Sequence, residues 1–209
     1  MRVRISRSAV MLTAGVIIVG IVGVWRNGEG MAVLWIRLLP WLIVMAAALL
    51  HELGHIVIAR CVGVGIRGMK LDLFGARLEL GGLLSYGQEC LIAAGGPLVN
   101  FLSAALLYPI PVFRGTGEGA LFLGVSITLG CVNLLPVWTL DGGRILRGVV
   151  AWFGGDRVAN RTLRATTGLC LGFLWILAVY ALLREGQMLS LFAFSLCLLA
   201  RSIAGKDGV

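Results

Sequence analysis

The sequence predicts an all-α polytopic membrane protein with about six transmembrane helices and a short membrane-associated β-hairpin. Of its 209 residues, 59% are hydrophobic and only 13% are charged, and the mean hydropathy is +0.96. A soluble globular domain has a charged fraction of about a quarter. Five apolar stretches are long enough to cross a hydrocarbon core, which takes about 20 residues per helix, and a sixth is nearly long enough. The predicted spans lie near residues 9–25, 36–62, 90–110, 119–137, 166–183 and 187–203.

The first predicted span follows a basic start with Arg2, Arg4 and Arg7, as the apolar part of a secretory signal peptide would. It runs into Trp25 and Arg26 rather than into a small-residue cleavage site. We therefore expect a signal anchor that is retained in the membrane.

The basic residues predict how the chain is oriented. With both termini placed in the cytoplasm, 14 of the 18 Lys and Arg residues fall on the cytoplasmic side. Cytoplasmic loops of membrane proteins carry such an excess of basic residues. The net charge of +8 is therefore explained by membrane orientation. We expect no nucleic-acid partner, since the basic residues are spread through loops without an aromatic platform or a recognised module.

Two short elements are predicted outside the spans. Apolar and polar residues alternate over 69–73 and 76–80 around Gly75, a pattern that predicts a β-hairpin within residues 65–87. Its backbone has to be satisfied by protein or water, so the hairpin should lie among helices or at the membrane interface. Residues 144–157 place apolar side chains at helical spacing beside arginines, which predicts an amphipathic helix at the cytoplasmic interface.

The segment His51-Glu52-Leu53-Gly54-His55 places two imidazoles four residues apart on one face of the second span. These are the only two histidines in the chain. Ionisable groups inside a membrane are expensive and usually functional, which favours a zinc site over two buried histidines that merely have hydrogen-bond partners. Zinc would lower the pKa of a bound water to about 7, and a carboxylate beside it, Glu52, could take the proton.

A zinc ion held by two histidines still needs a third protein ligand. Asp141 is the strongest candidate, because it follows the apolar run of the fourth span and precedes Gly142 and Gly143. Paired glycines allow the backbone to approach another helix closely. The alternative interpretation is an ordinary aspartate at a helix end.

The HELGH segment and residues 133–144, which read NLLPVWTLDGGR, resemble the two signature motifs of the site-2 protease family of zinc intramembrane metalloproteases. The run from Gly95 to Asn100 is similar to a weaker family motif. Length and six-span layout resemble the sporulation-type members, typified by stage IV sporulation protein FB. Members of this type often carry a C-terminal cystathionine-β-synthase-like domain, and other bacterial members of the family carry PDZ domains. We expect neither here, but one membrane domain over residues 1–209 with its core at 36–153.

The resemblance implies a role for each matching residue. His51, His55 and Asp141 would bind Zn²⁺, Glu52 would be the general base, and Asn133 would contact the substrate or the developing oxyanion. For Asn133 the alternative is a hydrogen bond that joins two helices, and for Asn100 that alternative is favoured. Pro136 would break the fourth helix and set the approach of Asp141, or would be a tolerated kink.

The expected function is zinc-dependent endopeptidase cleavage of a membrane-associated protein, such as a sigma-factor precursor or a membrane-tethered transcriptional regulator. A separate membrane protein could inhibit or regulate it, and its location would be a bacterial cytoplasmic or forespore membrane. Two alternatives stay open: a membrane metal transporter, which would string its ionisable groups across the bilayer, and a non-catalytic scaffold, whose structural zinc would be closed by four protein ligands.

Overall fold

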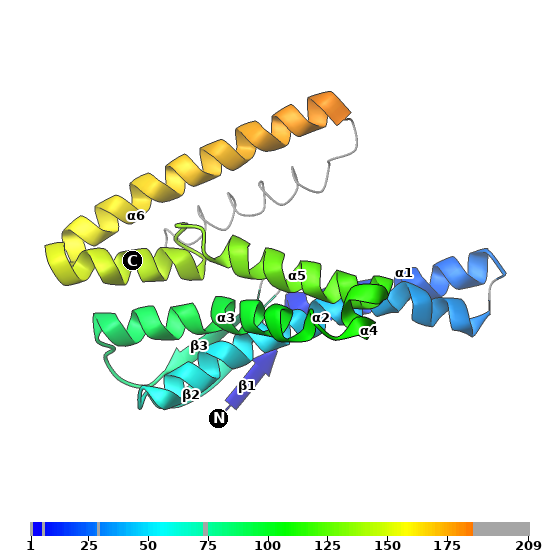
Figure 1. Cartoon of the computed structure of the whole chain (residues 1–209), viewed down its shortest axis with the longest axis horizontal. Coiled ribbons are helices and arrows are strands. Elements are labelled where there is room, and N and C mark those ends of the chain that lie inside the picture. Colours follow the sequence, from blue (N-terminus) through cyan, green and yellow to red (C-terminus); the bar gives the residue numbers. More distant parts are fainter. Residues whose placement is uncertain (1, 6, 29, 73–74, 186–209) are drawn as a thin grey trace. The chain divides into compact units, whose positions relative to one another are not determined.

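The computed structural model describes residues 2–5, 7–28, 30–72 and 75–185 (Figure 1). The predicted sixth span, 187–203, lies outside the described residues. Two compact units are present: one comprises Met1–Leu84 and Gly95–Cys131, and the other comprises Ser85–Ala94 and Val132–Val209. The helices are α1 (Arg7–Arg26), α2 (Met31–Cys61), α3 (Tyr86–Leu107), α4 (Pro111–Gly115), α5 (Gly117–Asn133) and α6 (Asp141–Glu185).

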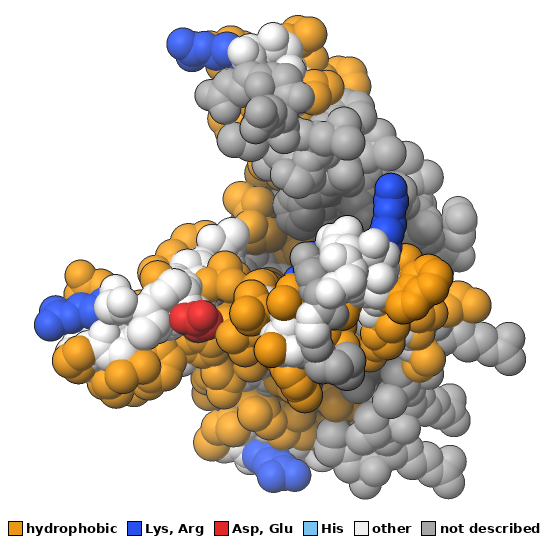
Figure 2. Space-filling model, turned by 90° about the vertical axis from the view of Figure 1, so that its right-hand side faces the viewer, with side chains coloured by type: hydrophobic (Ala, Val, Ile, Leu, Met, Phe, Trp, Pro, Cys, Tyr) orange, Lys and Arg blue, Asp and Glu red, His pale blue; other side chains and the backbone are white. Residues whose placement is uncertain are grey.

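Within the described residues, three helices are long and apolar enough to cross a membrane. They cover Ala32–Cys61, Tyr86–Leu107 and Asp141–Arg184, and shorter apolar helices cover Thr13–Arg26 and Gly117–Asn133. Each of the first five predicted spans overlaps one of these five segments. Large apolar side chains such as Trp25, Leu49 and Leu183 are exposed, and hydrophobic side chains cover much of the face drawn in Figure 2. Such surfaces suit lipid better than water.

The predicted hairpin is present in the first unit and belongs to a larger sheet. Strands β2 (Ile66–Asp72) and β3 (Gly75–Leu80) are antiparallel. A further strand, β1 (Arg2–Ile5), pairs with β2 in parallel, so the strand order is β1-β2-β3 and β3 is an edge strand. The expectation of an all-α chain with only a hairpin is wrong in this respect. The first residues form a strand because β2 offers them an open edge.

Helices α2 and α3 approach each other through glycine in the first unit. A Cβ on Gly54 would overlap the carbonyl of Gly95, and a Cβ on Gly95 would lie 2.7 Å from the carbonyl oxygen of Gly54. Small residues permit such backbone contact between helices in membranes. The crossing lies within the HELGH segment of α2, so it fixes α3 directly beside the two histidines.

In the second unit, an irregular connection over residues 134–140 joins α5 to α6. The predicted fourth span was expected to be helical to residue 137, but α5 ends at Asn133. Pro136 explains the early end, because proline lacks an N–H and disfavours helical backbone in the preceding residue. Val137 and Leu140 pack on Leu171 of α6.

Helix α6 consists of two segments that meet at Gly155, where the backbone is non-helical with φ 74° and ψ 170°. Only glycine adopts this conformation readily. The first segment is the predicted amphipathic helix, and the second contains the predicted fifth span. Arg147 binds Glu89 of α3 at 3.0 Å and Asp156, just beyond the bend, at 3.2 Å. These ion pairs hold both segments of α6 on the beginning of α3.

Candidate metal centre

Helix α2 presents His51 and His55 one turn apart on a single face, as the i, i+4 spacing requires. Their exposed fractions are 4% and 5%, their ring centroids lie 4.9 Å apart, and the ring planes are nearly perpendicular at 82°. The two imidazoles are therefore close enough to share one ligand.

Gly96 of α3 lies against both rings at the atoms a metal would use. A Cβ added at Gly96 would overlap Nε2 of His55 and would come within 2.6 Å of Nε2 of His51. Glycine therefore leaves free the space in front of the two nitrogens that any larger residue would fill. This space beside Gly96, the cradle of the metal centre, fits a metal bound through both Nε2 atoms.

Asn100 of α3 lies one turn beyond Gly96 and reaches the far side of the His51 ring. Its side chain is 0% exposed, and its Nδ2 lies 3.2 Å from Nδ1 of His51. Its Oδ1 is buried without a hydrogen bond. The sequence favoured a hydrogen bond from Asn100 to another helix, and the structure shows that the partner of Asn100 is His51, a predicted metal ligand.

Glu52 follows His51 on α2 and is half-buried, with its Oε2 shielded from solvent. A carboxylate in this position next to the two histidines is placed as the HExxH pattern predicts. Asn133 is the last residue of α5 and is also half-buried.

Asp141 is the first residue of α6 and is 8% exposed. A carboxylate is favoured at a helix N-terminus, where backbone N–H groups give a partial positive charge. Gly142 and Gly143 follow because a Cβ at either position would overlap a backbone carbonyl of residues 134–137. Arg144 lies 3.7 Å from the carboxylate of Asp141. The connection that Pro136 interrupts thus ends in a tightly packed turn that holds Asp141.

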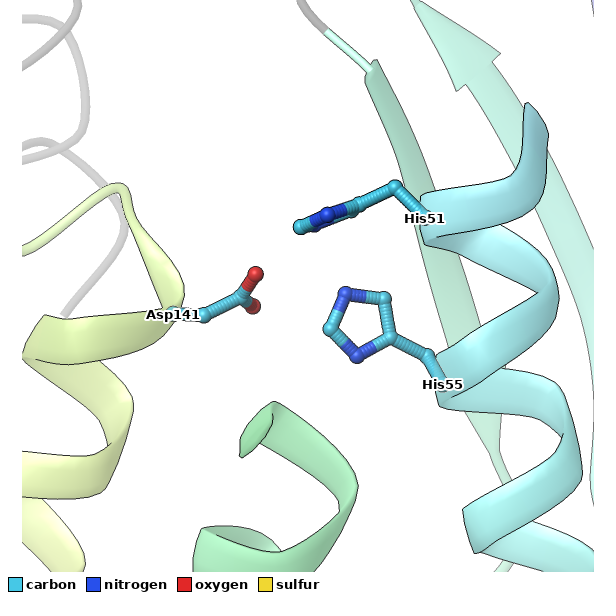
Figure 3. A group of neighbouring side chains, drawn as sticks. All are labelled: His51, His55 and Asp141. Atoms are coloured by element: carbon cyan, nitrogen blue, oxygen red, sulfur yellow. The ribbon is translucent and has the colours of Figure 1, made fainter. Parts of the chain in front are cut away.

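Three side chains among the described residues form a group that could hold a metal ion. One potential ligand atom from each of His51, His55 and Asp141 lies within 4.8 Å of the others, and all three side chains are buried (Figure 3). Two imidazoles and one carboxylate form the donor set of catalytic zinc sites, in which the fourth position is left to water or substrate.

Residues 119–177 match Peptidase family M50. The resemblance to the site-2 protease family, predicted from the HELGH and NLLPVWTLDGGR segments, is confirmed by this match together with the similar proteins and the solved structure described below. The M50 match includes Asn133, Pro136 and Asp141, and it extends into the second segment of α6.

The chain is also similar to curated proteins and to a solved structure. The chain is 32% identical over 141 residues to zinc metalloprotease MJ0392 of Methanocaldococcus jannaschii, covering 65% of this chain and 39% of that one. It is 31% identical over 160 residues to stage IV sporulation protein FB of Bacillus subtilis, covering 72% and 54%. The chain thus spans only about a third to a half of the curated relatives it matches.

The site-2 protease structure from M. jannaschii superimposes with a TM-score of 0.67, covering 97% of this chain and 89% of that one. The identity in this comparison is 21%, so it establishes the fold. The fold of this chain is accordingly similar to the fold of that structure.

Proposed function

We propose that this protein is a zinc-dependent intramembrane endopeptidase that cleaves a membrane-associated protein within or near the bilayer. The observation that carries the proposal is the buried group of His51, His55 and Asp141, with potential ligand atoms within 4.8 Å of one another. The match of residues 119–177 to Peptidase family M50 and the similarity to proteins named as zinc metalloproteases support it.

In this proposal, His51, His55 and Asp141 hold the metal. Zinc, when bound, supplies a Lewis acid that polarises the scissile carbonyl and makes water acidic enough to react at neutral pH. Glu52 accepts the proton of the attacking water and returns it to the leaving amine. Asn133 donates a hydrogen bond to the substrate carbonyl oxygen as negative charge develops on it.

A transmembrane substrate has to be unwound before attack, because a helix keeps its carbonyls in its own hydrogen bonds. Strand β3 (Gly75–Leu80) is an edge strand of the sheet, and edge strands bind extended peptides through backbone hydrogen bonds. We propose that it receives the unwound segment of the substrate.

The proposal extends to the topology, location, substrate and regulation of the protein. We propose six spans with both termini in the cytoplasm, a location in a bacterial cytoplasmic or forespore membrane, and one catalytic domain with its core at 36–153. The substrate would be a sigma-factor precursor or a membrane-tethered transcriptional regulator, and a membrane-protein partner would control access to it. The likeness to stage IV sporulation protein FB supports the first substrate class.

The decisive experiment is Glu52→Gln, measured for zinc content and for cleavage of a membrane-tethered substrate. Glutamine preserves the shape of the side chain but cannot accept the proton. We expect zinc to stay and cleavage to fall by about 10²–10⁴-fold, the usual contribution of a general base. Glu118→Gln, the same change at an exposed position of α5, is the matched control and should leave both unchanged. Zinc binding with cleavage at the parent rate would show that Glu52 is not the base.

A further inference from the structure

We propose that Asn100 is a positioning residue of the metal centre: its side-chain oxygen accepts a hydrogen bond from Nδ1–H of His51 and thereby directs Nε2 of that ring to the metal. The inference rests on the proposed function only in that His51 is a ligand. It adds to that function a residue that decides which ring nitrogen binds.

The geometry distinguishes the two nitrogens of His51. Gly96 lies against Nε2 of both His51 and His55, so the space for the metal is on the Nε2 side of the rings. Nδ1 of His51 points the other way, to the amide of Asn100 at 3.2 Å. Gly96 and Asn100 are four residues apart, so one face of α3 provides both the opening at Nε2 and the partner at Nδ1.

The tautomer of the His51 ring decides whether Asn100 has to donate or accept a hydrogen bond. A neutral imidazole that binds a metal through Nε2 carries its proton on Nδ1, which becomes a donor and needs an acceptor. The structure has Nδ2 of Asn100 facing Nδ1, which suits the opposite tautomer, with the proton on Nε2. That tautomer cannot bind a metal through Nε2.

A half-turn of the Asn100 amide resolves the conflict. The turn exchanges Oδ1 and Nδ2 without changing the shape of the side chain. Oδ1 makes no hydrogen bond in its present position, so the turn breaks none that it accepts. With the oxygen facing Nδ1–H, the ring is held in the tautomer and orientation that metal binding requires, as carboxylates and carbonyls do for metal-bound histidines generally.

The test compares zinc dissociation constants of the full chain in lipid nanodiscs, measured by competition with a chromogenic chelator. Asn100→Leu keeps the branched arrangement of heavy atoms but removes the acceptor, and we expect it to weaken zinc binding by about 10–100-fold. Asn100→Asp restores the acceptor and should bind zinc at least as tightly as the parent. Ser126→Ala removes another side-chain oxygen that is 0% exposed, from α5, and should not alter zinc binding. A residue that only joins helices would give the opposite pattern, with Asn100→Leu at the parent affinity or Asn100→Asp as weak as Asn100→Leu, and either result would overturn the proposal.

A measurement on the parent protein needs no variant to fold. With ¹⁵N-labelled histidine and ¹¹³Cd²⁺ in place of zinc, coupling identifies the ring nitrogen that binds, and the chain has only two histidines to assign. We expect His51 to couple through Nε2 and to carry a hydrogen-bonded proton on Nδ1. Coupling through Nδ1 would refute the role of Asn100 while leaving His51 a ligand. Unchanged metal binding in His51→Ala would instead refute the proposed function.

Discussion

The substitution Gly96→Ala tests the cradle of the metal centre with a single methyl group. The added Cβ would lie 2.6 Å from Nε2 of His51 and closer still to Nε2 of His55. Ordinary van der Waals contact begins at about 3.4 Å, so α3 or the imidazoles have to move by about 0.8 Å to relieve the contact with His51 and by more to relieve the contact with His55. The methyl group would fill the space in front of the two Nε2 atoms, where a metal bound to both of them would lie.

The expected magnitude follows from the cost of overpacking. Inserting a methyl group into a packed site costs about 1–3 kcal/mol, which corresponds to a loss of about 5–150-fold in metal affinity if the metal-bound arrangement carries the whole cost. Alanine is also a better helix former than glycine by about 1 kcal/mol. This gain should partly offset the strain in the metal-free protein, so the variant should fold.

The assay is zinc competition titration together with thermal unfolding of the metal-free protein. Gly124→Ala is the matched control, because it makes the same change inside α5 where no atom lies within 4 Å of the new Cβ. We expect weaker zinc binding for Gly96→Ala and parent affinity for Gly124→Ala. Parent affinity in both variants would mean that Nε2 of these histidines does not face the metal.

Three further predictions use other parts of the chain. Asp141→Ala should lose both zinc and activity, because two histidines and water make a weak site; full zinc occupancy of the purified variant would place the third ligand elsewhere. Lys206→Cys should be labelled from the cytoplasmic side, as the distribution of basic residues predicts, and labelling from outside would contradict the proposed topology. Arg147→Ala should lower the free energy of unfolding by about 1 kcal/mol at low salt and by less at high salt, because the ion pairs of Arg147 with Glu89 and Asp156 are partly exposed. Arg157→Ala is the control, because Arg157 is exposed. Equal effects of the two substitutions would show that these ion pairs do not stabilise the fold.

The sequence predicts the parts of the site that depend on local spacing. His51 and His55 share a helical face wherever that helix lies, and the alternation over residues 69–80 is a local property of strands. Asp141 stands out because its apolar surroundings and the paired glycines are unusual for an aspartate.

Other features depend on contacts between distant segments. Residues 2–5 look like a basic flank, and only pairing with β2 makes them a strand. From the sequence, Asn100 is expected only to join two helices by a hydrogen bond, and its relation to the metal centre is seen once its partner, Nδ1 of His51, is known. Pro136 indicates that α5 ends early, but the apolar residues continue beyond that proline, so hydropathy alone predicts a longer helix.

The glycine crossing of α2 and α3 limits how these two helices can move against each other. Where Gly54 meets Gly95, backbone lies on backbone, and no side chain is available to change rotamer and absorb a shift. Sliding along the axes would drive Val99 or Ile58 into the opposing backbone, since both already border the crossing. The crossing therefore opposes sliding of α2 along α3. If the protein is the proposed endopeptidase, we expect cross-linking of α2 to α3 near this crossing to leave its proteolysis intact.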